Sequence, residues 1–165
     1  ARHRMARKIS DAAPLDRLPL WRAADRFVPM YARAADTLEP ATAPGVTSYA
    51  DPAYGRELRL VLTPDGAATA TALHDGARAT GGHAATGYQL GWTPGTEYTA
   101  ATFDLDLRAA TEPHVAAVTT VTVDGAPVAA VADAAALTAC PRACWLAEPG
   151  RLRVRVDGAG QVEIR

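Results

Sequence analysis

Two parts of the chain alternate apolar and polar residues with a period of two. In residues 56–62 leucines occupy every second position, and in residues 151–156 arginines alternate with leucine and valine. Because neighbouring side chains of a strand point to opposite faces, both parts are expected to be half-buried strands with one wet face. The expected core row comprises Leu58, Leu60, Leu62, Leu152, Val154 and Val156, and it continues in Val162 and Ile164.

Further strand-forming runs follow at short spacing and are separated by turn signals. The signals are Pro-Asp-Gly at 64–66, Asp-Gly at 75–76, 124–125 and 157–158, and Pro-Gly at 149–150. Such residues favour tight turns, and a regular succession of short strands is typical of an antiparallel all-β sandwich. Besides the two alternating parts, the expected strands are 69–74, 85–90, 97–107, 115–123, 127–131 and 161–165.

Three segments need separate interpretation. Residues 13–30 hold the densest set of large apolar side chains, but three prolines forbid a continuous helix, so we expect an extended, irregular segment. Residues 58–62 and 69–74 are expected to form a hairpin. Residues 130–137 have high helix propensity, yet their alanine-rich composition suits a loop or a strand equally well.

A stretch of small and polar residues interrupts this pattern at 78–83. It contains Gly81-Gly82 and offers little surface to bury. We therefore expect a joint here, between two small antiparallel β-sandwich domains in tandem, 1–80 and 81–165. The length of 165 residues, 48% of them hydrophobic and 6% aromatic, suits one large or two small globular domains.

Three motifs carry a resemblance to a known family. APLDRLPLWRAADRFVPM at 13–30 is similar to the segment that leaves the catalytic barrel of glycoside hydrolase family 31 enzymes and enters their C-terminal β-sandwich. LRLVLTPDG followed by ATALHDGA, at 58–77, is similar to the next strands of that proximal sandwich. VTVDGAPV at 121–128, followed by a Trp and a closing LRVRV hairpin, resembles the distal sandwich. The sequence departs from the family pattern at 22–24, where Arg-Ala-Ala replaces Arg-Ala-Gly, and by one extra residue before Pro29.

The resemblance implies that the chain is the non-catalytic C-terminal part of a retaining α-glycosidase. Residues 1–80 would be the proximal sandwich and 81–165 the distal one. The family's catalytic aspartates belong to the barrel, which this sequence lacks, so no catalytic residue is carried over. The expected partner is that missing barrel of the same polypeptide, and the residues expected to dock against it are Trp21 and Phe27.

Composition argues against several other partners. A formal net charge of −1 provides no general attraction to nucleic acid, and the short basic run at residues 2–8 is typical of a solvated end. No apolar run approaches the roughly 20 residues needed to cross a bilayer, so no membrane partner is expected. The four histidines are scattered and no phosphate-binding fingerprint is present, so we expect neither a metal nor a cofactor.

Sugar binding is the alternative function. Trp92 lies beside Thr-Pro-Gly and near Tyr88 and Tyr98, and exposed aromatic rings on a β scaffold give sugars an apolar stacking surface. The opposite interpretation, which we favour, is that Trp92 covers the edge of the second sandwich. A free-standing carbohydrate-binding module that uses these three residues is therefore kept as the alternative to a glycosidase fragment.

A catalytic role would fall to Asp104 and Asp106, which share one face of an expected strand. Glycoside hydrolysis needs a carboxylic acid of raised pKa and a pocket that holds the sugar. These two side chains are expected on a solvated face, with no tuning of their pKa. We therefore expect no hydrolysis of glycosides by this chain alone.

The two cysteines, Cys140 and Cys144, are spaced C-x3-C around Pro141. A turn here would bring their Cα atoms within the roughly 4.4–6.8 Å that a disulfide requires, although so short a loop adds little stability. We expect a local disulfide, with two reduced buried thiols or half of a metal site as open alternatives. The localisation is left open, and a disulfide would favour an extracellular one.

Overall fold

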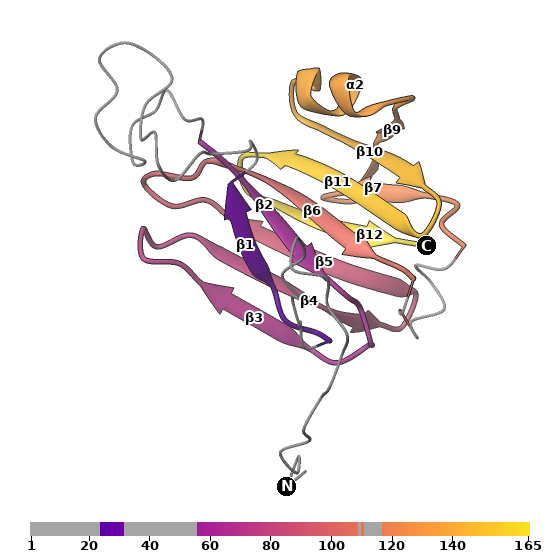
Figure 1. Ribbon diagram of the computed structural model, residues 1–165, viewed down its shortest axis with the longest axis horizontal. Coiled ribbons are helices and arrows are strands. Elements are labelled where there is room, and N and C mark those ends of the chain that lie inside the picture. Colours follow the sequence, from indigo (N-terminus) through magenta and orange to yellow (C-terminus); the bar gives the residue numbers. More distant parts are fainter. Residues whose placement is uncertain (1–23, 32–55, 109, 111–116) are drawn as a thin grey trace, which may run out of the picture.

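The computed structural model describes residues 24–31, 56–108, 110 and 117–165. These residues form two six-stranded sheets that lie one above the other, with one short helix outside the first sheet (Figure 1). Sheet A has the strand order β1-β2-β6-β11-β10-β9, and sheet B the order β3-β4-β5-β12-β7-β8. The all-β sandwich class expected from the alternation is confirmed.

Most neighbouring strands run antiparallel. The exceptions are in sheet A, where β2 runs parallel to β6 and β9 runs parallel to β10, so the sandwich is not purely antiparallel. Sheet A consists of β1 (Val28–Tyr31), β2 (Glu57–Leu62), β6 (Ala100–Asp106), β9 (Ala129–Ala130), β10 (Ala143–Glu148) and β11 (Arg151–Asp157). Sheet B consists of β3 (Thr69–Ala72), β4 (Arg78–Ala84), β5 (Gly87–Thr93), β7 (Val121–Val123), β8 (Ala126–Pro127) and β12 (Gly160–Ile164).

One hydrophobic core lies between the sheets. Every residue of the expected core row is buried, including Leu60 and Leu152 in sheet A and Ile164 in sheet B. The row therefore does not lie along one sheet, because its members face each other across the sandwich. The largest fully buried side chains are Trp92, Tyr88 and Phe103, so a few aromatic rings fill the centre of a sequence that is otherwise rich in alanine.

The division into domains 1–80 and 81–165 does not describe the sandwich that the structure shows. Strand β4 runs across the expected joint, and both sheets take strands from both halves of the chain. The small residues of β4 serve close packing instead: a Cβ on Gly81 would lie 3.2 Å from the ring of Phe27, and one on Gly82 would lie 3.1 Å from the Cα of Ala68. Glycine here allows sheet and loop to approach, which a linker would not require.

The expected hairpin at 58–74 is wrong, because this connection crosses between the sheets. The LRVRV segment does form a hairpin, β10–β11, and the chain after it makes a second crossing to β12. Strand β2 belongs to sheet A and β3 to sheet B, and the same holds for β11 and β12. At the first crossing the carboxylate of Asp25 accepts hydrogen bonds from the backbone N–H groups of Asp65 (2.8 Å) and Ala67 (3.1 Å). At the second, Gly158 has a positive φ of 82° and donates its N–H to the carbonyl of Thr99. The positions of the turns were correctly expected, but the sheet that the following strand joins was not.

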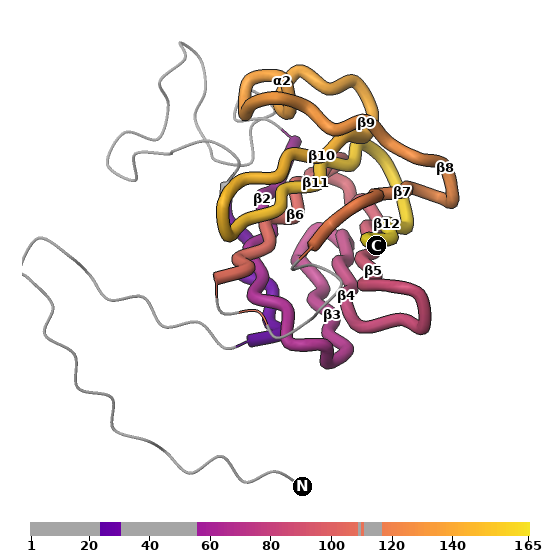
Figure 2. Tube along the Cα trace, turned by 90° about the vertical axis from the view of Figure 1, so that its right-hand side faces the viewer, coloured from indigo at the N-terminus to yellow at the C-terminus, as the bar shows by residue number. Residues whose placement is uncertain are grey.

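The ambiguous segment near residue 130 divides into a short strand and a helix. Strand β9 comes first, and helix α2 (Ala134–Ala139) follows. Asp133 caps the helix, since its side chain accepts a hydrogen bond from the N–H of Ala136. Leu137 of α2 packs against β10, and Figure 2 shows the helix on the outer side of sheet A. Within the described ranges no helix has the length and hydropathy to cross a membrane.

Candidate functional site

The three aromatic residues considered for sugar binding are all inside the core. Trp92 is 1% exposed, and Tyr88 and Tyr98 are buried as well. The indole N–H of Trp92 donates to the carbonyl of Thr99 at 3.4 Å, which orients the ring within the sandwich. Trp92 and Tyr88 offer no ring face to a ligand, and Tyr98 reaches only the wall of a small pocket beside Met30 and His74, so the three rings do not form the shared stacking surface of the binding-module interpretation.

Of the two residues expected to dock against a partner domain, Phe27 belongs to the core. Its ring centroid lies 5.9 Å from that of Phe103, and the side chain is buried. Trp21 lies outside the described residues. The next residues of the chain have the character expected of a docking surface: Val28 and Met30 are 38% and 46% exposed. Strand alternation places them on the outer face of sheet A, opposite the side on which Phe27 packs.

Both cysteines are free thiols in this structure, so the expected disulfide is not formed. Cys140 follows α2, and Cys144 lies on β10, where it is buried with Leu137 and Leu146. Burial, followed by the hydrogen bond and charge of the neighbouring Cys140, raises the pKa of Cys144 to about 12. Cys144 is therefore a protonated, unreactive thiol at neutral pH.

A network of charged side chains lies on the outer face of sheet A. Inward burial of the leucines and valines of β2, β6 and β11 turns the intervening polar residues of these strands outward. The register of the three strands then brings opposite charges together in the middle of the sheet. The residues concerned are Glu57, Arg59, Asp104, Asp106, Arg151, Arg153 and Arg155.

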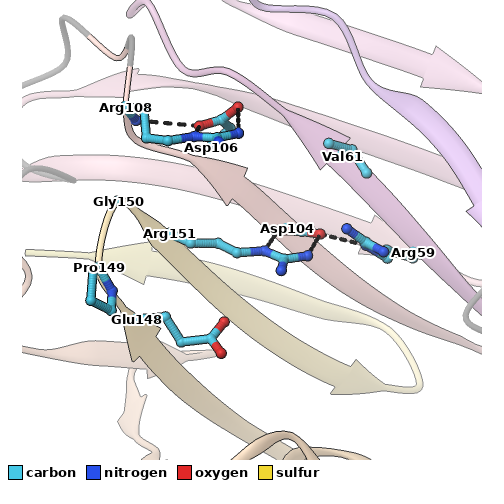
Figure 3. A pocket seen from close by; sticks show the side chains of 9 residues that line it. All are labelled: Arg59, Val61, Asp104, Asp106, Arg108, Glu148, Pro149, Gly150 and Arg151. Atoms are coloured by element: carbon cyan, nitrogen blue, oxygen red, sulfur yellow. Dashed lines mark hydrogen bonds and ion pairs between the residues drawn. The ribbon is translucent and has the colours of Figure 1, made fainter. Parts of the chain in front are cut away.

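Asp104 is the centre of this arrangement and is only 2% exposed. Its carboxylate accepts a hydrogen bond from Nε of Arg59 and two from Arg151, through Nε and Nη2 (Figure 3). Burial acts to raise the pKa of Asp104, but the hydrogen bonds and charges of the two arginines hold it below its ordinary value. The expectation of a solvated side chain with an unshifted pKa is therefore wrong for Asp104.

The other carboxylates on this face have arginine partners of their own. Arg108 binds Asp106 through two bonds of 2.8 Å, and Arg153 donates to Glu148 at 2.8 Å. Arg155 donates to Glu57 at 3.0 Å and also contacts the carbonyl of Cys140 at 2.5 Å. The Arg153–Glu148 pair links the neighbouring strands β11 and β10, whereas the Arg155–Glu57 pair reaches from β11 across β6 to β2.

Six charged residues of this face line a groove of about 490 Å³, namely Arg59, Asp104, Asp106, Arg108, Glu148 and Arg151. The guanidinium groups of Arg59 and Arg151 lie on either side of Asp104 along its floor, and Arg108 with Asp106 forms one end (Figure 3). The remaining lining comes from Val61 and from the turn between β10 and β11, namely Glu148, Pro149 and Gly150. Sequence reasoning placed Asp104 and Asp106 on one face, but it missed the arginines, which lie 45 and 47 positions from Asp104 along the chain.

The three carboxylates that line the groove, those of Asp104, Asp106 and Glu148, are all paired with arginine. The acid of such a site has a raised pKa, whereas the pKa of Asp104 is lowered. Asp106 is bound by a fork of two hydrogen bonds from Arg108. What the groove does present is guanidinium groups in a fixed arrangement, which suits binding of an anionic group. Among the described residues, no group of three or more His, Cys, Asp and Glu side chains could hold a metal ion.

Comparison with known proteins identifies the fold. No protein-family model matches the chain, and no curated protein does. Among solved structures, the cycloalternan-forming enzyme of Listeria monocytogenes, in complex with a pentasaccharide substrate, superposes with a TM-score of 0.54 over 86% of this chain at 15% identity. A Listeria monocytogenes protein of uncharacterized function, bound to glucose, magnesium and calcium, gives a TM-score of 0.55 with the same coverage and identity. The glycoside hydrolase family 31 dextranase of Flavobacterium johnsoniae, in complex with isomaltotriose, gives 0.50 over 66% of this chain at 10% identity.

The chain matches only a small part of each of these proteins. It covers 13% of the two Listeria chains and 16% of the dextranase. At such low identity the likeness concerns the fold. The resemblance to family 31 enzymes that the sequence motifs indicated is therefore present in the structure as the fold of a part of such enzymes.

Proposed function

We propose that this chain is the non-catalytic C-terminal β-sandwich portion of a retaining α-glycosidase and that it supports a catalytic barrel from the same polypeptide. The observation that carries the proposal is the asymmetry of coverage: the likeness spans 66–86% of this chain but only 13–16% of much larger carbohydrate-active proteins. The lowered pKa of Asp104 and its arginine partners support a non-catalytic role.

The proposal assigns docking to the outer face of β1. Val28 and Met30 are the large apolar side chains that the described chain leaves exposed, and Val61 of β2 lies opposite Val28 in the register. Together these three residues form an apolar edge beside the charged groove. A domain that covers this edge would bury surface that water otherwise contacts. Phe27 contributes from beneath, because it fixes β1 to the core.

The experiment compares the 165-residue chain with the complete protein encoded by its gene. We expect the complete protein to hydrolyse an aryl α-glycoside and the chain alone to leave it intact. Met30→Asp should lower the melting temperature of the complete protein while leaving that of the isolated chain nearly unchanged. Ala70→Asp is the matched control, because Ala70 is exposed on sheet B. A gene that encodes no further domain would contradict the proposal.

A further inference from the structure

Arg59 and Arg151 share a single carboxylate, that of Asp104. Two positive charges and one negative charge leave a surplus of one positive charge on the floor of the groove. The other charged side chains of the lining are Asp106 with its partner Arg108, and Glu148, whose partner Arg153 lies outside the lining. The six charged side chains of the lining sum to zero, and within the groove the positive charge is concentrated at Arg59 and Arg151.

The two guanidinium groups also retain unused donors. Arg59 bonds to Asp104 through Nε, and Arg151 through Nε and Nη2. Within the described part of the chain, no acceptor is bonded to Nη1 and Nη2 of Arg59 or to Nη1 of Arg151. The side chains are 37% and 34% exposed, so water and solutes can reach them. Because buried Asp104 already orients both groups, a ligand would not have to order them.

We propose that this groove binds a carboxylate group through Arg59 and Arg151. A planar carboxylate matches the paired donors of a guanidinium fork. Asp106 and Glu148 line the same groove and would repel a dianion such as phosphate more strongly than a monoanion. The volume of about 490 Å³ accommodates a monosaccharide-sized acid. This binding activity goes beyond the proposed supporting role and does not depend on it.

The direct test uses nuclear magnetic resonance of the ¹⁵N-labelled chain titrated with sodium glucuronate. The Nε–H signals of Arg59 and Arg151 should shift and saturate, with a dissociation constant on the order of millimolar, because the contacts are partly exposed to water. Glucose, which has the same ring without the carboxylate, should leave these signals unchanged, and sodium chloride controls for ionic strength. Equal shifts with glucose, or no saturable shift with glucuronate, would overturn the proposal.

A second arm distinguishes the source of the carboxylate. Sodium acetate presents the group without a sugar ring. If acetate and glucuronate bind with similar affinity, the site recognises the carboxylate alone, as in an acidic side chain. If glucuronate binds at least about tenfold more tightly, the groove also contacts the sugar ring, as expected for an acidic saccharide. Both outcomes support the proposal and assign its ligand.

Arginine substitutions test whether glucuronate binds in the groove. Arg59→Gln should weaken glucuronate binding about tenfold, because a charge-assisted hydrogen bond is lost, and Arg59→Lys should give an intermediate loss. Arg165→Gln is the matched control, because Arg165 pairs with Glu163 at the end of β12 in sheet B. An equal loss in Arg165→Gln would show nonspecific attraction and overturn the assignment. The glucuronate and glucose comparison on the unaltered chain stands even if a variant folds poorly.

Discussion

The outer face of sheet A consists of two halves that exclude water by different means. On β10, Cys144 and Leu146 lie beneath helix α2, where Leu137 covers them. On β6, Asp104 is equally inaccessible, but no helix of the described residues covers it; it is enclosed by Arg59 and Arg151 of the neighbouring strands. Register shows that these are halves of one face, since Leu146 pairs with Arg153 of β11, which in turn pairs with Asp104.

The comparison shows how one sheet face can be closed with or without a covering element. Apolar side chains require a partner that excludes water, and the chain supplies α2 for this purpose. A carboxylate is buried without cover only where ion pairs and hydrogen bonds offset its loss of hydration. Val28 and Met30 at the β1 edge are apolar and exposed. They are apolar like the residues beneath α2, but no element of the described chain covers them. For this reason we assign docking to them.

The largest expected effect comes from the half beneath α2. Leu146→Ala should lower the free energy of unfolding by about 2–4 kcal/mol, because it leaves a cavity between α2 and β10. Urea denaturation at neutral pH measures the loss. Ala147→Ser is the control, since Ala147 is the next residue of β10 and is exposed. Equal losses in the two variants would show that α2 does not form a packed cover.

The ionic half should respond less strongly. Asp104→Asn should lower the free energy of unfolding by about 1–3 kcal/mol, because two arginines lose their shared partner but remain partly hydrated. The control is Asp106→Asn, where the partner Arg108 is 77% exposed and loses little. If Asp106→Asn proved the more destabilising variant, Asp104 would not be the centre of the network.

Sequence patterns predicted the core-facing residues well because each pattern is local. The leucines of 58–62 and the valines of 152–156 alternate over a few positions, and burial follows from that alternation. The Pro-Asp-Gly and Asp-Gly turns were identified for the same reason. The sheet that a strand joins after a turn depends on contacts such as that of Asp25 with residues 65 and 67, which lie 40 or more positions apart.

The groove and the single sandwich were missed for related reasons. Asp104 looks like a solvated residue until Arg59 and Arg151 are placed beside it, and no short pattern connects these three residues. Gly81 and Gly82 have the composition of a linker, although they serve close packing against Phe27 and Ala68. Trp92 was expected to cover the edge of a second sandwich, but it lies in the core of the single one, where a large ring fills space in an alanine-rich chain.

The two halves should also differ in their response to acid. The folded pKa of Asp104 lies below its ordinary value of 3.8, so its contribution to stability is complete above that value and is lost as pH falls through the folded pKa. The difference in free energy of unfolding between the parent and Asp104→Asn should therefore shrink by on the order of 1 kcal/mol as the pH falls from 6 to 2.5. The corresponding difference for Leu146→Ala involves no charged group, so it should stay constant over the same pH range. Parallel pH dependence of both differences in urea titrations would contradict the assignment.

The smallest effect concerns chemical reactivity beneath α2 and leaves stability unchanged. With a pKa of about 12, Cys144 at pH 8 is a thiolate in only about one molecule in ten thousand. It is also buried, whereas Cys140 is only partly so. Iodoacetamide should therefore label Cys140 first in the reduced chain, and Cys144 should react only when α2 opens locally. Mass spectrometry of timed digests gives both rates.

Leu137→Ala should accelerate labelling of Cys144 but not of Cys140, because Leu137 forms the cover over β10. Equal labelling rates for the two cysteines in the parent chain would mean that α2 does not close this half of the face.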